Sequence, residues 1–406
     1  MAIAGSRILV LSTDPITERM PGPAIRAWHL AEVLSAEHEV VLASTVAATR
    51  NHPGMEVRQV EPGPELVALG RWMDILVAPP GVLYLWPQLA TSDRALVFDA
   101  YGPYHLEHLE PSSGAQPIPE RAAELSRFTG ALLEHLGCAD FVLCASERQR
   151  DYWTGALTAL GRVNPLTYDD DPSLRRLIDV VPFGMPAEPP RAGGRPLRER
   201  GAGLGPGDEI VLWAGGIYNW LDPVAAVRAV GSLAAHRPRL RLVFLGGGHP
   251  NPAIPGMRTA VEARSVSDAA GLTGRHVLFN DGWVPYDERA SWLLGADVGI
   301  STHQDHVETR YSFRTRVLDH LWAGLPSVLT AGDVLSDLVS EHGLGVAVPA
   351  GDPEAVAAAI EALLDAPRPG SDEFEPVRGM LRWPVVAAPL VAWCRNPAKA
   401  ADRSGR

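Results

Sequence analysis

The sequence predicts an α/β fold with two Rossmann-like, doubly wound domains that face an interdomain cleft. Short apolar strands alternate with amphipathic helices over residues 7–182, and the alternation restarts at residue 209. Such alternation implies parallel sheets with right-handed crossovers. A stretch rich in proline and glycine separates the two series, as is typical of a linker. A chain of 406 residues is long enough to build a core in each domain.

The strands of the first half are short apolar runs that each stop at a turn or a polar cluster. We predict them at residues 7–12, 40–44, 75–78, 95–98, 141–145 and 178–181. Apolar residues at helical spacing predict helices at residues 24–35, 125–136 and 147–160.

The second half repeats this pattern. We predict strands at residues 209–214, 240–245, 277–279, 297–301, 327–330 and 345–348. Helices are predicted from residue 223, at 256–270 and 286–294, up to residue 323, and at 335–341 and 353–364. The apolar run 374–394 follows the last strand, so we expect a C-terminal helix that crosses back to the first domain.

These patterns predict the domain organisation. The parts are a first domain at 1–182, a linker at 183–207, a second domain at 208–370, a returning segment at 371–396, and a flexible tail at 397–406.

Composition excludes several kinds of partner. The net charge of −12 argues against nucleic acid, which requires a broad basic face. The three cysteines have neither metal-ligand spacing nor a disulfide framework, which favours a reducing cytoplasm. No apolar run is long enough to predict an integral membrane segment. A homo-oligomer is compatible with this composition.

The stretch 303–326 has an unusual concentration of positive charge for an acidic chain. Arg310, Arg314 and Arg316 lie in a loop and at the start of a helix that follows the 297–301 strand. Guanidinium groups bind phosphate oxygens in bidentate fashion, and a helix N-terminus adds unpaired N–H groups. One turn later, Asp319 is placed to accept hydrogen bonds from a ribose. This order predicts a nucleotide-sugar pocket; the alternative is a solvated ion-pair network with Glu308 and Asp319.

Two other loops of the second half follow strands and so are expected at the same edge of the sheet. Gly215 and Gly216 would let the backbone approach a pyrophosphate. Trp283 is placed either to pack on a nucleobase or to cover the end of the sheet. A dinucleotide fingerprint is absent from the sequence, which argues against a nicotinamide oxidoreductase.

In the first half, Gly22 precedes a helix and is expected to face the cleft. Asp99, Tyr101 and His105 follow the 95–98 strand and supply an acid, a phenol and an imidazole for an acceptor. His303 and His306 have the residue type of metal ligands, as does Glu308 in the same loop. Without a third spaced histidine, hydrogen-bonding or structural roles are favoured, and we predict no metal site.

The sequence resembles the GT-B glycosyltransferases of retaining family 4, most strongly over residues 209–360. Asp319-His-Leu-Trp-Ala-Gly-Leu-Pro326 is similar to the second half of the family's Glu–seven residues–Glu motif and its following turn, with Trp322 replacing a small residue. The first glutamate of that motif is replaced by Tyr311, and the basic pair expected after Gly215-Gly216 is missing. Residues 181–185 resemble the family's interdomain signature.

The resemblance implies roles for individual residues. Donor binding falls to residues of the glycine, base-contacting and diphosphate-contacting loops and to the ribose carboxylate, namely Gly22, Gly215, Gly216, Trp283, Val284, Ser312, Phe313, Arg316 and Asp319. Glu308, Arg310 and Arg314 would take over catalysis, while Asp99, Tyr101 and His105 would bind the acceptor.

The resemblance also implies an activity, in which the first domain binds the acceptor and the second the donor. A metal-independent, hexosyltransferase-type enzyme would move sugar, with retention, from a GDP- or UDP-linked donor to a small-molecule acceptor, without a cofactor. Natural-product or cell-envelope glycan biosynthesis is the expected setting. The alternatives are a nucleotide-sugar epimerase of the same architecture and an inactive nucleotide-sugar-binding homologue, which the Tyr311 departure favours.

Overall fold

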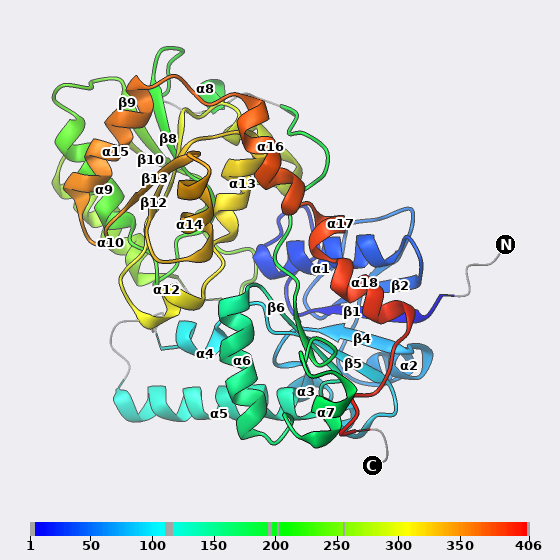
Figure 1. The fold of residues 1–406 in the computed structure, drawn as a ribbon. Helices are drawn as coiled ribbons and strands as arrows, with labels where there is room; N and C mark the ends of the chain where they lie inside the picture. Colours follow the sequence, from blue (N-terminus) through cyan, green and yellow to red (C-terminus); the bar gives the residue numbers. More distant parts are fainter. Residues whose placement is uncertain (1–4, 110–116, 194–196, 201–202, 255, 404–406) are drawn as a thin grey trace. The chain divides into compact units, whose positions relative to one another are not determined.

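The chain is divided into two compact units (Figure 1). The computed structural model describes residues 5–109, 117–193, 197–200, 203–254 and 256–403. Of these, unit 1 contains residues up to Gly184 together with residues from Trp383 onward, and unit 2 contains Met185–Arg382. The fold is the predicted α/β architecture, with one parallel sheet and flanking helices in each unit.

Unit 1 contains a seven-stranded sheet in the order β3-β2-β1-β4-β5-β6-β7. All neighbouring strands pair in parallel. The strands are β1 (Arg7–Ser12), β2 (Glu39–Ser44), β3 (Glu56–Gln59), β4 (Ile75–Ala78), β5 (Ala95–Asp99), β6 (Phe141–Cys144) and β7 (Ile178–Val180). The four residues of β4 are all apolar and all buried, because helices cover both faces of a parallel sheet.

The helices of unit 1 flank this sheet. They are α1 (Gly22–Leu34), α2 (Pro64–Trp72), α3 (Val82–Leu85), α4 (Tyr104–Glu107), α5 (Ile118–Cys138), α6 (Glu147–Ala159) and α7 (Pro165–Asp170), with a 3₁₀ turn at Pro87–Thr91. Ser146 caps α6, because its side chain accepts a hydrogen bond from the Gln149 amide.

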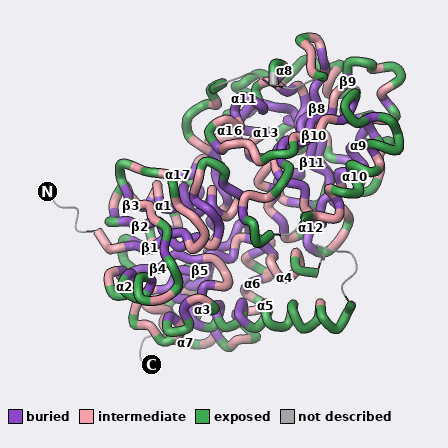
Figure 2. The backbone as a smooth tube through the Cα atoms, turned by 180° about the vertical axis from the view of Figure 1, so that it is seen from behind, coloured by how far each residue is buried: buried purple, intermediate pink, exposed green. Residues whose placement is uncertain are grey.

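Unit 2 contains a six-stranded parallel sheet in the order β10-β9-β8-β11-β12-β13. The strands are β8 (Glu209–Trp213), β9 (Leu240–Phe244), β10 (Val277–Phe279), β11 (Val298–Ser301), β12 (Ser327–Thr330) and β13 (Gly345–Val348). In Figure 2 the strands within each unit are largely purple, since the sheets form the buried cores.

The helices of unit 2 follow its strands in alternation. They are α8 (Leu197–Arg200), α9 (Pro223–Leu233), α10 (Arg258–Ala269), α11 (Arg289–Leu293), α12 (Val307–Tyr311), α13 (Thr315–Ala323), α14 (Val334–Glu341), α15 (Pro353–Asp365) and α16 (Ser371–Met380), with a 3₁₀ turn at Tyr286–Glu288. No helix within the described ranges is both long and apolar enough to span a membrane.

The strand order of each sheet contains one point where the direction of winding reverses. It lies between β1 and β4 in unit 1 and between β8 and β11 in unit 2. Doubly wound sheets bind ligands in the crevice at the carboxyl ends of the strands at this point. The loops after β8 and β11 are therefore the first place to look for a ligand site.

The chain returns to unit 1 later than the sequence predicts. The expected returning segment begins at residue 371, but α16 belongs to unit 2, where the Arg378 Nε donates to the Leu321 carbonyl at 2.8 Å. Only from Trp383 does the chain belong to unit 1. There α17 (Trp383–Val386) contacts α1, and α18 (Ala388–Arg395) follows (red in Figure 1).

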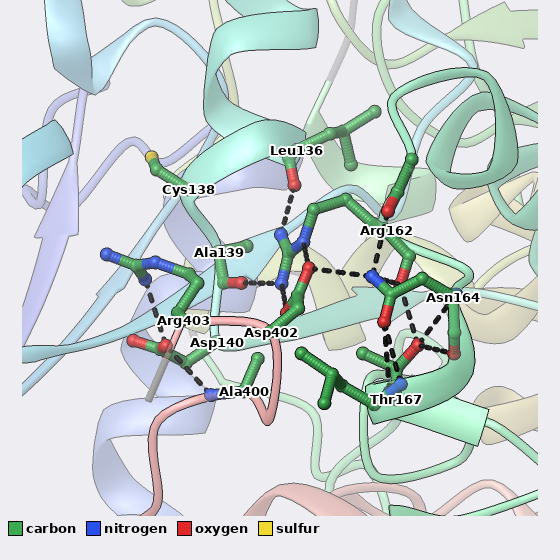
Figure 3. Close-up of polar contacts among 12 residues, drawn as sticks. Leu136, Cys138, Ala139, Asp140, Arg162, Asn164, Thr167, Ala400, Asp402 and Arg403 are labelled. Atoms are coloured by element: carbon green, nitrogen blue, oxygen red, sulfur yellow. Dashed lines mark hydrogen bonds and ion pairs between the residues drawn. The ribbon is translucent and has the colours of Figure 1, made fainter. Parts of the chain in front are cut away.

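The segment 397–403, expected to be part of a flexible tail, is bonded to unit 1 (Figure 3). Arg162 forms an ion pair with Asp402 at 2.6 Å, and the Ala400 amide donates to buried Asp140 at 3.0 Å. Arg403 pairs with the same Asp140 at 2.9 Å, and Lys399 donates to the carbonyl of Ser92. The prediction was wrong here because these partners are distant in sequence. Residues 404–406 lie outside the described part of the chain.

Candidate functional site

The loops that follow β8 and β11 are joined at the carboxyl edge of the unit 2 sheet. The Asp222 amide donates to the Thr302 carbonyl at 3.0 Å, and Leu221 forms an antiparallel bridge with His303. Asp222 also caps α9, because its side chain accepts a hydrogen bond from the Ala225 amide. The reversal point of the sheet is thus lined by two loops that support each other.

The predicted glycine loop packs tightly against the neighbouring strand ends. Gly215 has a φ of +112°, a conformation that other residues adopt with strain. A Cβ atom at Gly246, after β9, would lie 2.8 Å from the Gly215 carbonyl carbon. A Cβ atom at Gly216 would lie 3.2 Å from the Trp283 ring. The structure therefore brings Gly215, Gly216 and the 280–285 loop of Trp283 and Val284 together at this edge.

The Arg316 guanidinium lies against this glycine loop. Its Nη2 donates to the Gly216 carbonyl at 2.7 Å, and its Cζ lies 4.6 Å from the centre of the Trp213 ring. Its Nη1 is buried and has no hydrogen-bond partner, and no carboxylate among the described residues pairs with this side chain. Burial, with a smaller contribution from Arg314, lowers the pKa of Arg316 to about 9. A buried cation with an unused donor is a suitable ligand for an anion.

Arg314 and Glu308 form a buried, bidentate ion pair. Nη1 and Nη2 of Arg314 donate to the two carboxylate oxygens of Glu308 at 3.0 and 2.6 Å. The side chains are only 6% and 2% exposed, respectively. Both predicted catalytic residues thus use their principal hydrogen-bonding atoms on each other. The Nε of Arg314 remains buried without a partner.

Arg310 does not share this environment. It is exposed on α12, and its Cζ lies 6.0 Å from the centre of the Tyr311 ring. The structure therefore brings two of the three predicted arginines together. Ser312 and Phe313 lie between these elements, and the Ser312 hydroxyl donates to the Thr309 carbonyl at 3.0 Å. They lead directly into α13, which has no side-chain cap at its N-terminus, and such a terminus offers unpaired amides to an anion.

Asp319 lies on α13 beside an arginine that the sequence analysis missed. The Arg289 Nε donates to its Oδ1 at 3.1 Å, while the Arg289 Nη2 reaches the Tyr286 hydroxyl at 3.0 Å. The Arg289 guanidinium also lies over the Trp322 ring. Arg289 orients the Asp319 side chain, which is 34% exposed and therefore still accessible.

Of the metal-like residues of the 303–308 stretch, His306 lies 3.8 Å from Glu308, but His303 has other partners. The ring of His303 is buried between the Thr330 carbonyl, at 3.1 Å from its Nε2, and Asp333, at 3.4 Å. Glu308 faces Arg314 instead. Across the described ranges, no three histidine, cysteine, aspartate or glutamate side chains are arranged to hold a metal ion. The hydrogen-bonding role that the sequence favours is the one observed for His303.

In unit 1, Asp99 has a structural partner that leaves it little capacity to bind an acceptor. Both carboxylate oxygens accept hydrogen bonds from Arg26, at 2.6 and 2.8 Å. Arg26 is almost fully buried and also donates to the carbonyls of Val181 and Pro182. Arg26 could not be recognised from the sequence, where it is the single arginine of a largely apolar helix.

The other predicted residues of unit 1 lie around this pair. Tyr101 has its ring 4.8 Å from the Arg26 Cζ, and burial raises the pKa of its phenol well above the usual value. Gly22, predicted to bind the donor, begins α1, and a Cβ there would lie 4.0 Å from the Tyr101 hydroxyl. His105 lies on α4 with its ring stacked on Tyr152, and burial lowers its pKa.

A known protein family matches most of unit 2. Residues 208–366 match the family "Glycosyl transferases group 1". No curated protein matches the chain. The matched domain includes the glycine loop, Trp283, Arg314, Arg316 and Asp319.

Solved structures share the architecture across nearly the whole chain. Sucrose-phosphate synthase from Thermosynechococcus elongatus has a TM-score of 0.72 at 17% identity, covering 96% of this chain and 98% of its own. The α,α-trehalose 6-phosphate synthase from Burkholderia multivorans has a TM-score of 0.66 at 13% identity, covering 99% of each chain. HepE from Anabaena, in complex with UDP-glucose, has a TM-score of 0.60 at 12% identity, covering 95% of this chain and 98% of its own. The chain thus has the GT-B fold, and its matched domain supports a glycosyltransferase of GT-B type.

Proposed function

We propose that the protein is a retaining glycosyltransferase of family 4 that moves a hexose from a nucleotide-diphosphate sugar to a small-molecule acceptor. The observation that carries this proposal is the half-buried Arg316 side chain, whose buried Nη1 is an unused donor and whose Nη2 donates to the Gly216 carbonyl. A diphosphate oxygen is the partner that best satisfies such a donor, because the pairing is charge-assisted.

The chemistry follows from where charge develops. As the sugar C1–O bond to the diphosphate breaks, negative charge grows on the leaving oxygen, while the acceptor oxygen bonds to C1 and its proton passes to the departing diphosphate. Arg316 and the first-turn amides of α13 would stabilise that charge without reorganising. Since a guanidinium supplies the positive charge in this scheme, the proposed reaction requires no divalent ion.

The rest of the donor would occupy the neighbouring loops. The Asp319 carboxylate, oriented by Arg289, would accept hydrogen bonds from the ribose, and Trp283 would pack on the base. UDP-glucose is the first donor to test. The HepE structure from Anabaena contains it, and an E. coli protein of similar fold is bound to UDP-2-fluoro glucose. A GDP-linked sugar is the second.

The acceptor assignment rests on less specific features. The acidic net charge of −12 supports a small molecule of natural-product or cell-envelope glycan biosynthesis over an anionic surface. We place acceptor contacts in unit 1 around His105, because Asp99 is occupied by Arg26. A cytoplasmic location is part of the proposal, supported by three cysteines that are free and buried.

One observation favours a second candidate, a homologue that binds a nucleotide sugar without transferring it. Tyr311 stands where the family's first glutamate would contact the sugar, and nearby Glu308 is committed to Arg314. Binding of donor with neither transfer nor hydrolysis, across a broad set of acceptors, would support this candidate over the transferase.

The experiment is a thermal-shift and calorimetric comparison of UDP, GDP, ADP and TDP on the wild type, Arg316→Gln and Arg310→Gln. The proposal expects one diphosphate to bind the wild type, with affinity reduced by roughly tenfold or more in Arg316→Gln, which loses a charge-assisted contact. Arg310→Gln is the matched control, since that exposed arginine should change affinity little. A wild type that binds no nucleoside diphosphate, or equal losses in both variants, would refute the proposal.

A further inference from the structure

The Glu308–Arg314 ion pair closes a short loop at the proposed donor site. The two side chains come from α12 and from the residue that precedes α13, and five residues lie between them. Both carboxylate oxygens and both Nη atoms take part, at 3.0 and 2.6 Å. A bidentate pair of this kind fixes orientation as well as distance, because the guanidinium and carboxylate planes must match.

Hydrogen bonds in and next to the loop also restrict its backbone. The Thr309 hydroxyl donates to the Gln304 carbonyl at 2.9 Å, and the Ser312 hydroxyl donates to the Thr309 carbonyl at 3.0 Å. The Val317 amide donates to the Arg314 carbonyl at 2.9 Å, which starts α13. The backbone of residues 309–313 is therefore held at both ends and in its middle.

The same geometry limits what Arg314 can do electrostatically. The Glu308 carboxylate neutralises its charge at hydrogen-bonding distance, and both side chains are largely shielded from solvent. In contrast, Arg316 has no such carboxylate partner among the described residues. Of the two neighbouring arginines, only Arg316 brings uncompensated positive charge to the edge of the sheet.

We propose that Glu308 and Arg314 form a positioning clip rather than a catalytic pair. The clip holds the 309–313 backbone and the start of α13 in the geometry that receives the diphosphate, and Arg316 is the side chain that touches it. This inference rests on the proposed function for the identity of the ligand. The existence of the clip itself can be measured without any ligand.

The clip and a direct electrostatic role predict opposite signs for Glu308→Gln. If Arg314 neutralised the diphosphate, removing the competing negative charge of Glu308 would tighten donor binding, and Arg314→Gln would weaken it. If the pair is a clip, both substitutions break the same interaction and both weaken binding. The double variant would then be no worse than the more damaged single variant, because coupled residues are not additive.

The experiment combines hydrogen exchange of the ligand-free protein with calorimetry of nucleoside diphosphate binding. The variants are Glu308→Gln, Arg314→Gln, their double variant and Arg314→Lys, which keeps the charge but loses the bidentate geometry. Glu262→Gln is the matched control, because it removes an exposed ion pair with Arg258 in the same unit. Thermal unfolding confirms that each variant is folded. If a variant with a neutral side chain does not fold, Arg314→Lys, which keeps the positive charge, still tests the inference.

The clip predicts that amides of residues 309–313 exchange roughly tenfold faster in the clip variants, with unchanged exchange elsewhere in unit 2. It also predicts roughly tenfold weaker diphosphate binding in each clip variant, including Arg314→Lys. Unchanged exchange, tighter binding by Glu308→Gln, or full binding by Arg314→Lys would overturn it. If the wild type binds no nucleoside diphosphate, the proposed function and the donor role of the clip both fail. The exchange data then still decide whether the clip exists.

Discussion

Arg162 and Asp402 form a buried ion pair between residues 240 positions apart in the chain. The Arg162 Nε and Nη2 donate to the two carboxylate oxygens at 2.6 and 3.1 Å, and the side chains are 5% and 9% exposed. Arg162 also donates to the carbonyls of Leu136 and Ala139 (Figure 3). Through Arg162, the last described turn of the chain is thus linked to the end of α5 in unit 1.

Asp402→Asn should therefore destabilise unit 1. The substitution leaves Arg162 as a buried charge without a counter-ion, and breaking a buried pair in this way costs about 3 kcal/mol. Urea unfolding measures the loss. Glu37→Gln is the control: it breaks an exposed pair with Arg395 and should change stability by less than about 1 kcal/mol. Equal effects of the two substitutions would contradict a structural role for the tail.

Asp99→Asn separates the structural role of Asp99 from the predicted acceptor role. Arg26 would lose its counter-ion in a site where its side chain is 1% exposed, so we expect a loss of about 3 to 5 kcal/mol in unfolding free energy. If Asp99 instead bound the acceptor, stability would be nearly unchanged and the acceptor KM would rise. Urea unfolding and transfer kinetics together distinguish the two outcomes.

Gly246→Ala should impair donor binding, whereas Gly248→Ala should not. A Cβ at Gly246 would lie 2.8 Å from the carbonyl carbon of Gly215 and 2.9 Å from the Gly216 amide, so the glycine loop would have to move. A displacement of this size is expected to cost roughly tenfold or more in affinity for the nucleoside diphosphate. Gly248 has open space around its Cβ position and serves as the matched control. Calorimetry that finds both variants equal to the wild type would argue against the glycine loop as part of the site.

The stability of the protein should fall as the pH drops from about 6.5 to about 4. Burial lowers the pKa of His135 to about 4, and the Leu83 amide donates to its Nε2 at 2.8 Å. The unfolded chain binds a proton near pH 6.5 and the folded chain does not, so stability is full above that range and decreases below it. The shift corresponds to about 3 kcal/mol.

His135→Gln tests this dependence. The variant should show a smaller loss of unfolding free energy between pH 6.5 and pH 4, measured by urea titrations at each pH. His320, whose pKa burial lowers to about 3, contributes in the same direction and remains in the variant. An unaltered slope in His135→Gln would show that His135 does not contribute.

The alternating architecture could be predicted because buried parallel strands are short, largely apolar runs. The strands Arg7–Ser12, Ile75–Ala78 and Ser327–Thr330 have the predicted bounds. The strand Glu56–Gln59 was missed, since its sequence, Glu-Val-Arg-Gln, is mostly polar, as befits an edge of the sheet.

The position of the site was also predictable, since loops after strands meet at one edge. Gly216, Trp283 and Arg316 come together for this reason. The pairing of charges was not predictable, because it depends on side-chain direction and burial. An ion-pair network with Glu308 and Asp319 is the alternative that the sequence offers for this stretch. Spacing alone does not indicate that Arg314 is the partner of Glu308, that this pair is buried, or that Arg289 orients Asp319.

The contacts of the C-terminal segment make the chain's single lysine a natural reporter. The Lys399 amine donates to the Ser92 carbonyl at 3.0 Å and lies 3.5 Å from Asp140, and burial lowers its pKa. Lys399 is the only lysine in the chain, and the other permanently charged basic side chains are arginines. Reagents that acylate amines therefore have one side-chain target. Because the Lys399 amine is partly covered and bonded to the Ser92 carbonyl, acylation there should be slower while the segment is bonded than when it detaches. The acylation rate of Lys399 therefore reports how often the C-terminal segment detaches from the rest of unit 1, without any engineered label.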